Sequence, residues 1–262
     1  MMQLYGNIEL LTGYTSRTQQ ARRISEDWVA RYAYCLKCES GELTPTSANT
    51  ETCDFVCPKC DHGYELKSKC GAFTTRVVDG AYGAMLRTIR ANRTPTFLLL
   101  EYSRDWSITG FTAIHHSLIT ENSIVARKPL ASTARRAGWV GCSIIMPEIA
   151  VDGKIPIVIN ERIEPPAQVR GSFRKLESLA QLSHEKRNWA ATILNLIRKL
   201  PEDPFKLSDV YEFEEQLKLI FPENNNIKPK IRQQLQMLRD AGILTFLGGE
   251  KYRFARYLAS GL

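Results

Sequence analysis

Two acidic residues and a lysine lie close together in the cysteine-rich stretch of residues 53–69. Asp54 stands eleven residues before Glu65, and Lys67 completes the pattern D-x10-E-x-K. On a strand, the side chains of Glu65 and Lys67 project from the same face, because side chains alternate with a period of two. The sequence therefore predicts a carboxylate and an ammonium group side by side, opposite a second carboxylate.

This set of groups suits the metal-dependent hydrolysis of a phosphodiester. Asp54 and Glu65 offer the hard oxygen ligands that Mg2+ prefers, and the main-chain carbonyl of Leu66 can add a third. The metal neutralises phosphate charge and lowers the pKa of a bound water. Lys67 can then position or deprotonate that water and stabilise the developing negative charge. We predict a magnesium site and a catalytic centre made of these residues.

The D…E-x-K pattern is weak on its own. Asp, Glu and Lys are common residues, and a solvated strand face explains a chance match. The context favours the catalytic interpretation, since the pattern adjoins a metal-binding motif in a basic chain. Glu26, on a preceding helix, is a candidate for a further ligand, and the alternative is an ordinary solvated helix charge.

Four cysteines in two C-x-x-C pairs flank the first carboxylate. Their spacing, C-x2-C-x18-C-x2-C, is typical of a tetrahedral zinc site with no open position, which is structural rather than catalytic. Two accidental pairs or a redox motif are the alternative. The predicted zinc ligands are Cys35, Cys38, Cys57 and Cys60. We expect this zinc to brace the turn between Asp54 and Glu65, while Cys53 is the thiol that could compete as a ligand.

The elements that must position these residues form a mixed α/β core up to about residue 180. Residues 16–32 read as an amphipathic helix, because apolar residues recur at intervals of three or four. A second helix is expected from Asp79, as its N-cap, to the residues before Pro95. The best strands are the apolar stretches 96–102, 107–114 and 155–159.

Beyond this core the pattern changes to three amphipathic helices and two short strand-like runs. The helices are expected at 184–200, 207–221 and 227–242, and the strands at 243–247 and 251–257. Three helices and a hairpin are the order of a winged-helix module. We therefore divide the chain into a catalytic domain, residues 1–182, and a winged-helix DNA-binding domain, residues 183–262. A polar linker around 171–183 can itself be partly helical.

A basic segment, residues 126–142, surrounds a tryptophan without a clean helical or strand period. Basic loops with a large aromatic suit a clamp on the nucleic-acid backbone plus a group that stacks on bases. A core tryptophan under a solvated basic loop is the equal alternative. The residues predicted to contact DNA are Arg127, Lys128, Arg135, Arg136 and Trp139.

The last predicted helix has the layout of a DNA recognition helix. One face is an apolar stripe made of Ile227, Ile231, Leu235 and Leu238. The opposite face carries glutamines that can pair with adenine and cations that can meet phosphate or guanine. These are Gln233, Gln236, Lys228, Lys230, Arg232 and Arg239, and the wing adds Lys251, Arg253 and Arg256. A protein-binding winged helix with a solvated basic face is the alternative.

Composition agrees with a globular protein that has a polyanionic partner. The chain has 262 residues, 44% of them hydrophobic, and a formal net charge of +7. The longest apolar run, residues 97–100, is too short to cross a bilayer, and the N-terminus lacks the features of a signal peptide. Seven cysteines without such a signal argue against a disulfide framework. We expect a cytoplasmic protein without membrane contact.

Several blocks of the sequence resemble the DpnI family of methyl-directed type IIM restriction endonucleases. They are SEDWVARYAYC, CDFVCPKC with YELKSK, DGAYGAM, RKPLASTARRAGWVGC and IRQQLQMLRDAGI, spread over residues 20 to 254. The resemblance implies a PD-(D/E)xK restriction-endonuclease-like core with an inserted four-cysteine zinc site and a C-terminal winged helix. It also implies that both domains read GATC when its adenine carries an N6-methyl group.

Position by position, the family's catalytic motif matches Asp54, Glu65 and Lys67, and its zinc ligands match the four cysteines. Its tryptophan near the methylated bases matches Trp139, whose flat indole offers apolar contact to methyl groups. Cys53 stands where the family motif has proline, so the PD element is incomplete, although the carboxylate remains.

We therefore expect a monomeric, Mg2+-dependent endonuclease that also holds structural Zn2+. It would cut double-stranded DNA at adenine-methylated GATC sites and spare unmethylated ones. Two alternatives remain open. One is a non-catalytic zinc-containing winged-helix reader or regulator of methylated DNA, and the other is a nuclease of the same fold with a different specificity.

Overall fold

The computed structural model describes residues 2–47 and 53–255. A seven-stranded sheet forms the centre of its larger part, with the strand order β1-β2-β3-β5-β6-β9-β10. Strands β3 and β5 are parallel, and the other neighbours are antiparallel. Its strands are β1 (Thr44–Pro45), β2 (Phe55–Val56), β3 (Gly63–Cys70), β5 (Thr96–Tyr102), β6 (Ile108–Ile114), β9 (Lys154–Ile159) and β10 (Arg162–Ile163). The three strands expected from apolar runs are confirmed as β5, β6 and β9.

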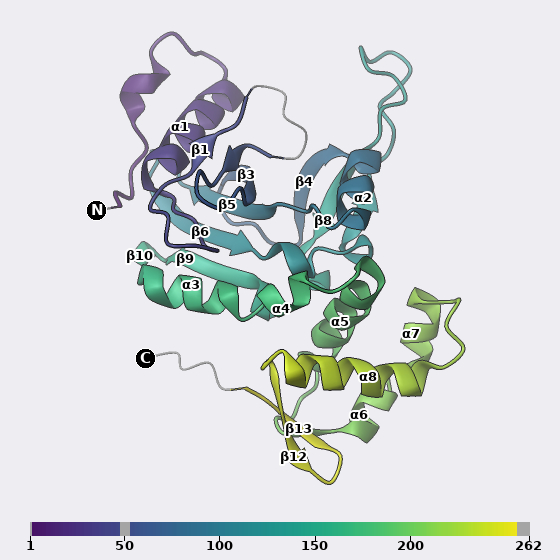
Figure 1. Ribbon diagram of the computed structural model, residues 1–262. Coiled ribbons are helices and arrows are strands. Elements are labelled where there is room, and N and C mark those ends of the chain that lie inside the picture. The colour runs from purple at the N-terminus through teal and green to yellow at the C-terminus, as the bar shows by residue number, and fades with distance from the viewer. Residues whose placement is uncertain (1, 48–52, 256–262) are drawn as a thin grey trace.

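Helices cover this sheet from two sides (Figure 1). Helix α1 (Arg17–Tyr32) packs against β3 and confirms the helix expected at 16–32. Its Trp28 is fully buried and meets the Phe111 ring of β6 edge-on, with 5.2 Å between centroids. Helices α3 (Pro166–Arg174) and α4 (Glu177–Ala180) follow β10, and α3 packs along β9. The polar segment expected as a linker is thus largely helical.

A second, three-stranded sheet lies beside the first, in the order β4-β8-β7. Its strands are β4 (Arg76–Ala81), β7 (Ile124–Ala126) and β8 (Gly141–Ile145), and α2 (Tyr82–Arg90) follows β4. The expectation that Asp79 caps α2 is wrong. Val77 and Asp79 point inward from β4 and are 1% and 8% exposed, because β4 pairs along β8 before the chain turns into the helix.

The C-terminal part contains the expected helices and hairpin, with two differences. The middle helix is broken at residues 212–213, so that Val210 and Leu217 enter the core from two separate short helices. A short strand, β11, also joins the hairpin, in the order β11-β13-β12. The elements are α5 (His184–Ile197), β11 (Phe205–Lys206), α6 (Leu207–Tyr211), α7 (Glu214–Ile220), α8 (Ile227–Asp240), β12 (Leu244–Gly248) and β13 (Lys251–Phe254).

Helix α5 joins the two parts of the molecule. It packs against α8 on one side, while its side chains bond to the α/β core on the other. Arg187, 2% exposed, donates to the Ile89 carbonyl at 2.9 Å, and Arg198 pairs with Asp152. Short 3-10 turns complete the fold, at η1 (Ile8–Leu11), η2 (His116–Leu118), η3 (Glu121–Ser123), η4 (Met146–Glu148) and η5 (Val151–Gly153).

The length and apolar character of the helices bear on whether any of them could cross a membrane. A bilayer-crossing helix needs about 20 predominantly apolar residues. Within residues 2–47 and 53–255, no helix combines that length with that apolar character.

Candidate active site

Strand β3 brings the E-x-K residues together. Glu65 and Lys67 project from one face of the strand, and Lys67 Nζ lies 2.7 Å from Glu65 Oε1. Their side chains are only 12% and 20% exposed. The intervening Leu66 faces the other way, and Tyr64 is completely buried. The alternative of a solvated strand face therefore does not fit the geometry.

Asp54 approaches the same strand from the start of β2. Its amide donates to the Tyr64 carbonyl at 2.9 Å, and its carboxylate Oδ2 accepts from the amide of Leu66 at 2.8 Å. This places the Asp54 carboxylate between the positions of Glu65 and Lys67 along β3. The three residues singled out by spacing thus form one compact group.

Asp79, on β4, is a fourth member of this group that the sequence did not predict. Its Oδ1 lies 2.7 Å from Lys67 Nζ, and its side chain is 4% exposed. A bulge in the pairing of β4 with β8 lies between Asp79 and Ala81, and such bulges re-aim side chains. The two β-branched valines before Asp79 in RVVDGA are the signal that could have predicted a strand here, on which Asp79 shares a face with Val77.

The charges of this group are strongly coupled. Burial raises the pKa of Glu65 and, together with the carboxylates of Asp54 and Asp79, outweighs the opposite effect of Lys67. Burial also opposes the ammonium of Lys67, but Asp79 and Glu65 outweigh it and raise the pKa of that lysine. Three carboxylates therefore face one ammonium group, and the site has an excess of negative charge that suits a divalent cation.

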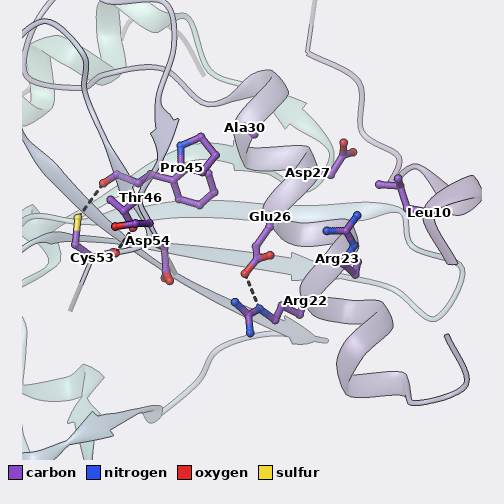
Figure 2. A pocket seen from close by; sticks show the side chains of 12 residues that line it. Leu10, Arg22, Arg23, Glu26, Asp27, Ala30, Pro45, Thr46, Cys53 and Asp54 are labelled. Carbon is purple, nitrogen blue, oxygen red and sulfur yellow. Dashed lines mark hydrogen bonds and ion pairs between the residues drawn. The ribbon is translucent and has the colours of Figure 1, made fainter. Parts of the chain in front are cut away.

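A cavity of about 420 Å³ adjoins Asp54 (Figure 2). Helix α1 lines its other side with Arg22, Arg23 and Glu26. The Glu26 carboxylate accepts from Arg22 Nε at 2.7 Å, so the structure places Glu26 in the same cavity as Asp54 but pairs it with a cation. The two arginines offer positive charge within reach of a phosphate that enters the cavity.

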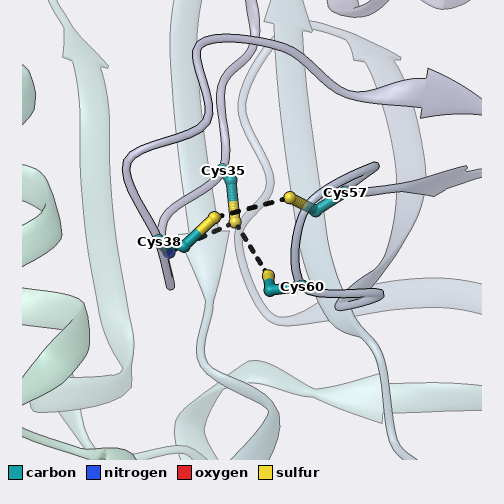
Figure 3. A group of neighbouring side chains, drawn as sticks. All are labelled: Cys35, Cys38, Cys57 and Cys60. Carbon is teal, nitrogen blue, oxygen red and sulfur yellow. Dashed lines mark hydrogen bonds between the residues drawn. The ribbon is translucent and has the colours of Figure 1, made fainter.

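The four predicted zinc ligands converge on one point (Figure 3). Cys35 Sγ lies 3.6 Å from Cys60 Sγ, Cys38 Sγ lies 3.5 Å from Cys57 Sγ, and all four sulfurs are within 4.8 Å of one another. Tetrahedral zinc with bonds of about 2.3 Å separates its sulfurs by roughly 3.8 Å. The cysteines are free thiols rather than disulfides. The group therefore fits a structural zinc ion, and Cys53 is not part of it.

Main-chain amides donate to sulfurs of this cluster, and they outweigh burial at Cys57, whereas burial raises the pKa of Cys35 and of Cys60. The amides of Cys38 and Lys59 donate to Cys35 Sγ and Cys57 Sγ, each at 3.4 Å. Burial opposes the Cys57 thiolate, but the amides of Lys59 and Cys60 outweigh it and lower the pKa of this thiol to about 7. Cysteine thiolates, not thiols, are the zinc ligands.

The cysteine cluster is bonded directly to β3, the strand that carries Glu65 and Lys67. The amide of Leu36, next to Cys35, donates to the Tyr64 hydroxyl at 2.9 Å, and that hydroxyl lies 3.3 Å from Cys35 Sγ. The Cys57 amide donates to the His62 carbonyl at 3.0 Å, so the second knuckle forms the turn between β2 and β3. Tyr64 immediately precedes Glu65, which makes a path from the cluster to the carboxylates.

The basic segment forms a hairpin extension between β7 and β8, which projects from the second sheet in Figure 1. Its four predicted cations, Arg127, Lys128, Arg135 and Arg136, are all exposed. Trp139 is partly exposed rather than a core residue. Its ring packs over Gly141, where a Cβ would come within 2.9 Å, and the Arg136 guanidinium lies 4.7 Å from the ring centroid.

Helix α8 has the predicted two-faced character. Its apolar stripe is at most 2% exposed, whereas Gln233 and Gln236 face solvent. Gln234, between them, is fully buried, and the sequence pattern did not single it out. Lys230 is also turned inward, with a side chain 17% exposed and its ammonium 5.6 Å above the Trp189 ring, because α5 packs there.

Most of the predicted DNA-contacting cations of this helix already have acidic partners. Lys228 lies 3.3 Å from Glu214, and Arg232 lies 3.8 Å from Glu250 of the hairpin turn. Arg239 pairs with the neighbouring Asp240. Such exposed ion pairs contribute little to the free energy of unfolding, and their cations can readily leave them for another anion. Lys251 is exposed and Arg253 partly so, while Arg256 lies outside the described residues.

Helix α8 and the hairpin form one surface. Arg232, Gln236 and Arg239 line a hollow of about 360 Å³ together with Phe246 and Tyr252 of the two strands. The residues predicted as recognition helix and wing therefore belong to one continuous face, with Glu250 as the acidic residue within it.

Comparison with protein families gives two matches along the chain. The model described as DpnI, Dam-replacing family, matches residues 2–182. The model described as DpnI_C, Dam-replacing HTH domain, matches residues 185–254.

Proposed function

The chain belongs to the DpnI, or Dam-replacing, family, and from this premise we propose that it is a methyl-directed restriction endonuclease. Its substrate is double-stranded DNA at GATC sites whose adenine carries an N6-methyl group, and its catalytic cofactor is Mg2+. The observation that carries the proposal is the packing of Asp54, Glu65 and Lys67 into one buried group beside a cavity that helix α1 lines with charged side chains of both signs.

The donor set fits a magnesium ion. Asp54 and Glu65 supply carboxylate oxygens and Leu66 a main-chain carbonyl, and the excess negative charge of the group favours a cation. When bound, Mg2+ neutralises phosphate charge and lowers the pKa of a coordinated water. Glu26 lines the same cavity, and we assign it to its ion pair with Arg22 rather than to the metal.

Lys67 acts as a cation in this proposal. Asp79 and Glu65 hold its ammonium in place and favour its charged form. A protonated lysine orients the attacking water by donating to it and stabilises the charge that develops on the phosphate. The two ion pairs thereby favour this role over that of a general base. Asp79 is a positioning residue, since it acts through Lys67.

The two family matches also suggest how the chain divides into domains. We propose a PD-(D/E)xK catalytic domain in residues 1–182 and a winged-helix domain in residues 183–262. The cysteine cluster binds zinc and braces β2 against β3 through Tyr64, without touching DNA. The chain acts as a monomer on its site.

Two surfaces contact DNA. The hairpin between β7 and β8 clamps the backbone with Arg127, Lys128, Arg135 and Arg136, and its partly exposed Trp139 meets the methyl groups by apolar contact. The α8 surface reads base edges with Gln233 and Gln236 and meets phosphates with its cations. The predicted cations are Lys228, Lys230, Arg232, Arg239, Lys251 and Arg253, of which Lys230 is the least accessible.

Plasmid DNA from adenine-methylating and non-methylating hosts tests the methyl requirement. We expect cleavage of the methylated plasmid alone, with Mg2+ present and at mapped GATC sites. Equal cutting of both plasmids overturns methyl dependence, and cuts at other sequences assign the chain a different specificity. A chain that binds methylated DNA but never cuts it is a reader rather than an enzyme.

A further inference from the structure

A cluster of imidazoles lies outside the proposed catalytic group. Three of the four histidines of the chain meet here, where β6 ends and η2 begins. The His115 and His116 rings lie 4.4 Å apart between centroids, and the His62 ring lies 4.8 Å from that of His116. Glu177, the first residue of α4, reaches the cluster from another part of the chain.

Two ring nitrogens and one carboxylate oxygen face each other. His115 Nε2 lies 3.4 Å and His116 Nε2 lies 3.9 Å from Glu177 Oε1, and the three donor atoms are within 4.8 Å of one another. The His115 side chain is 0% exposed and that of His116 is 11% exposed. The cluster is therefore screened from water. A polar atom without a hydrogen-bond partner in such a buried place lowers the stability of the fold.

At 3.4 Å, the contact between His115 and Glu177 is electrostatically favourable but lacks the angles of a hydrogen bond. Within the described part of the chain, neither His115 Nε2 nor Glu177 Oε1 has a hydrogen-bond partner of acceptable geometry, although both atoms are inaccessible to solvent. Native structures rarely leave such atoms unsatisfied, and an unplaced ion is one of the ordinary explanations. An ion between the three atoms would satisfy both of them.

We propose that His115, His116 and Glu177 form a second metal site, separate from the cysteine cluster, that takes Zn2+ or a similar transition-metal ion. Two imidazoles and one carboxylate are a recognised zinc donor set, whereas Mg2+ prefers oxygen ligands alone. Three protein ligands leave a fourth position for water or an anion. His116 also lines a cavity of about 740 Å³, through which the ion can enter.

Hydroxyl groups behind the rings complete the site. Ser117 Oγ lies 2.8 Å from His115 Nδ1, and Thr96 Oγ1 lies 3.4 Å from His116 Nδ1 and 2.8 Å from His62 Nε2. Metal-bound histidines usually donate their other ring N–H to such a partner. The Ser117 amide, 3.2 Å from the same His115 nitrogen, donates to it only in the other tautomer. Metal binding at Nε2 would therefore require the His115 proton to lie on Nδ1, at the expense of the bond from the Ser117 amide.

Lys37 limits the affinity of this site. Its ammonium lies 3.3 Å from Glu177 Oε2, the carboxylate oxygen that faces away from the imidazoles. A cation at that distance opposes a second cation on the same carboxylate. We therefore expect weaker binding than at the four thiolates, and an occupancy that depends on the metal supply.

The site would connect the core to the C-terminal part. Its two histidines belong to the end of β6 and to η2, while Glu177 belongs to the segment that leads into α5. A bound ion would fix this segment and hence the start of the helix that carries the DNA-binding face. This role is independent of the proposed nuclease activity.

Cobalt titration of the metal-free full-length chain tests the proposal, because Co2+ bound to thiolates gives strong sulfur-to-metal absorption that nitrogen and oxygen ligands lack. With excess Mg2+ present to occupy the proposed catalytic site, we expect two equivalents of Co2+ per chain, one with the thiolate signature and one without it. Cys57→Ser should remove the first and keep the second, and His116→Gln should do the reverse. A single equivalent with thiolate character in the unaltered chain overturns the proposal.

Two further variants guard against misfolding and local side effects. His184→Gln alters the remaining histidine, which pairs with Glu121 at 2.9 Å, and should leave both equivalents intact. Lys37→Gln removes the competing ammonium and should tighten the second equivalent, whereas equal or weaker binding would assign Glu177 to Lys37 alone. Unchanged thermal unfolding in EDTA shows that His116→Gln folds, and a His116→Gln chain that folds and still binds the second equivalent contradicts the assignment.

Discussion

Two regions of the molecule place acidic and basic side chains together in opposite ways. In the proposed catalytic group, Lys67 lies 2.7 Å from both Glu65 and Asp79, and the three side chains are between 4% and 20% exposed. On the α8 surface, Arg232 lies 3.8 Å from Glu250, and both are more than 60% exposed. The first arrangement fixes geometry, because separating a buried pair leaves an uncompensated charge. In the second, the exposed ion pair can break and Arg232 can bind a phosphate instead, at little cost in free energy.

This contrast suits the two regions to the different tasks that we propose for them. Catalysis needs groups held in one geometry, which the strands β2, β3 and β4 provide. DNA binding needs cations that leave their partners when the polyanion arrives, which the loops and α8 provide. We therefore expect changes in the first region to alter cleavage at constant affinity, and changes in the second to alter affinity and its dependence on salt.

The largest effect is expected from Lys67→Ala. Removal of the ammonium leaves three carboxylates without their cation, so the single-turnover rate should fall by about 10²–10⁴-fold. Binding of a methylated GATC duplex, measured by fluorescence anisotropy, should stay within about twofold because the α8 surface is unchanged. Cleavage that survives this change would remove Lys67 from the centre and with it the contrast between the two regions.

The next largest effect is expected from loss of the zinc brace. Cys57→Ser should lower the zinc content and reduce cleavage by about 10²-fold, since a displacement of about 1 Å in positioning groups has that cost. Cys70→Ser is the matched control, because Cys70 is an exposed thiol on the same β3. Zinc content, thermal unfolding and cleavage are measured together. Full activity without zinc would show that β2 and β3 hold the carboxylates unaided.

Asp79→Asn tests whether the buried network, rather than Lys67 alone, is needed. The amide keeps the shape of the side chain but removes the charge that faces Lys67, so we expect about a tenfold loss of kcat with little change in KM. Asp79→Glu should restore part of the rate by returning the charge. Asp240→Asn, which alters a carboxylate paired with Arg239 on the surface, is the control. A change in KM alone would make Asp79 a structural residue.

Asp79 also shows where prediction from sequence stopped. The spacing of Asp54, Glu65 and Lys67, and that of the cysteines, is local, so period and motif were sufficient to find those groups. Asp79 reaches Lys67 only because β4 pairs with β8, a strand far along the chain at Gly141–Ile145. No local pattern encodes that pairing, and the same residue type before a helix reads equally well as an N-cap.

Tertiary contacts also explain the other differences. The break at residues 212–213 and the short strand β11 depend on packing around α8 and the hairpin, which the apolar period of residues 207–221 does not reveal. Glu177 likewise meets His115 and His116 only in the folded chain, which is why the imidazole cluster had no sequence signal. The long, strongly periodic elements, α1, α5, α8 and β5, were predictable because their pattern and their packing agree.

A smaller effect is expected from Arg232→Ala on the α8 surface. Loss of one phosphate contact should weaken DNA binding and reduce the slope of log K against log salt by about one unit. The cleavage rate at saturating enzyme should be unchanged. Lys230→Ala is the informative comparison, because Lys230 is turned toward Trp189 and should change the slope less. An equal effect of the two variants would mean that Lys230 turns outward on DNA.

The smallest effect is expected from Glu250→Gln, which removes the acidic partner from the α8 surface. The ion pair is exposed, so the free energy of unfolding should change by less than about 0.5 kcal/mol. Arg232 is then free of its partner, and DNA should bind slightly more tightly at low salt, with the difference vanishing at high salt as screening grows. Urea unfolding and anisotropy over a salt series measure the two quantities. A large loss of stability would show that Glu250 orders the turn between β12 and β13. The exposed ion pair of this surface would then have a structural role, as we propose for the buried pairs around Lys67.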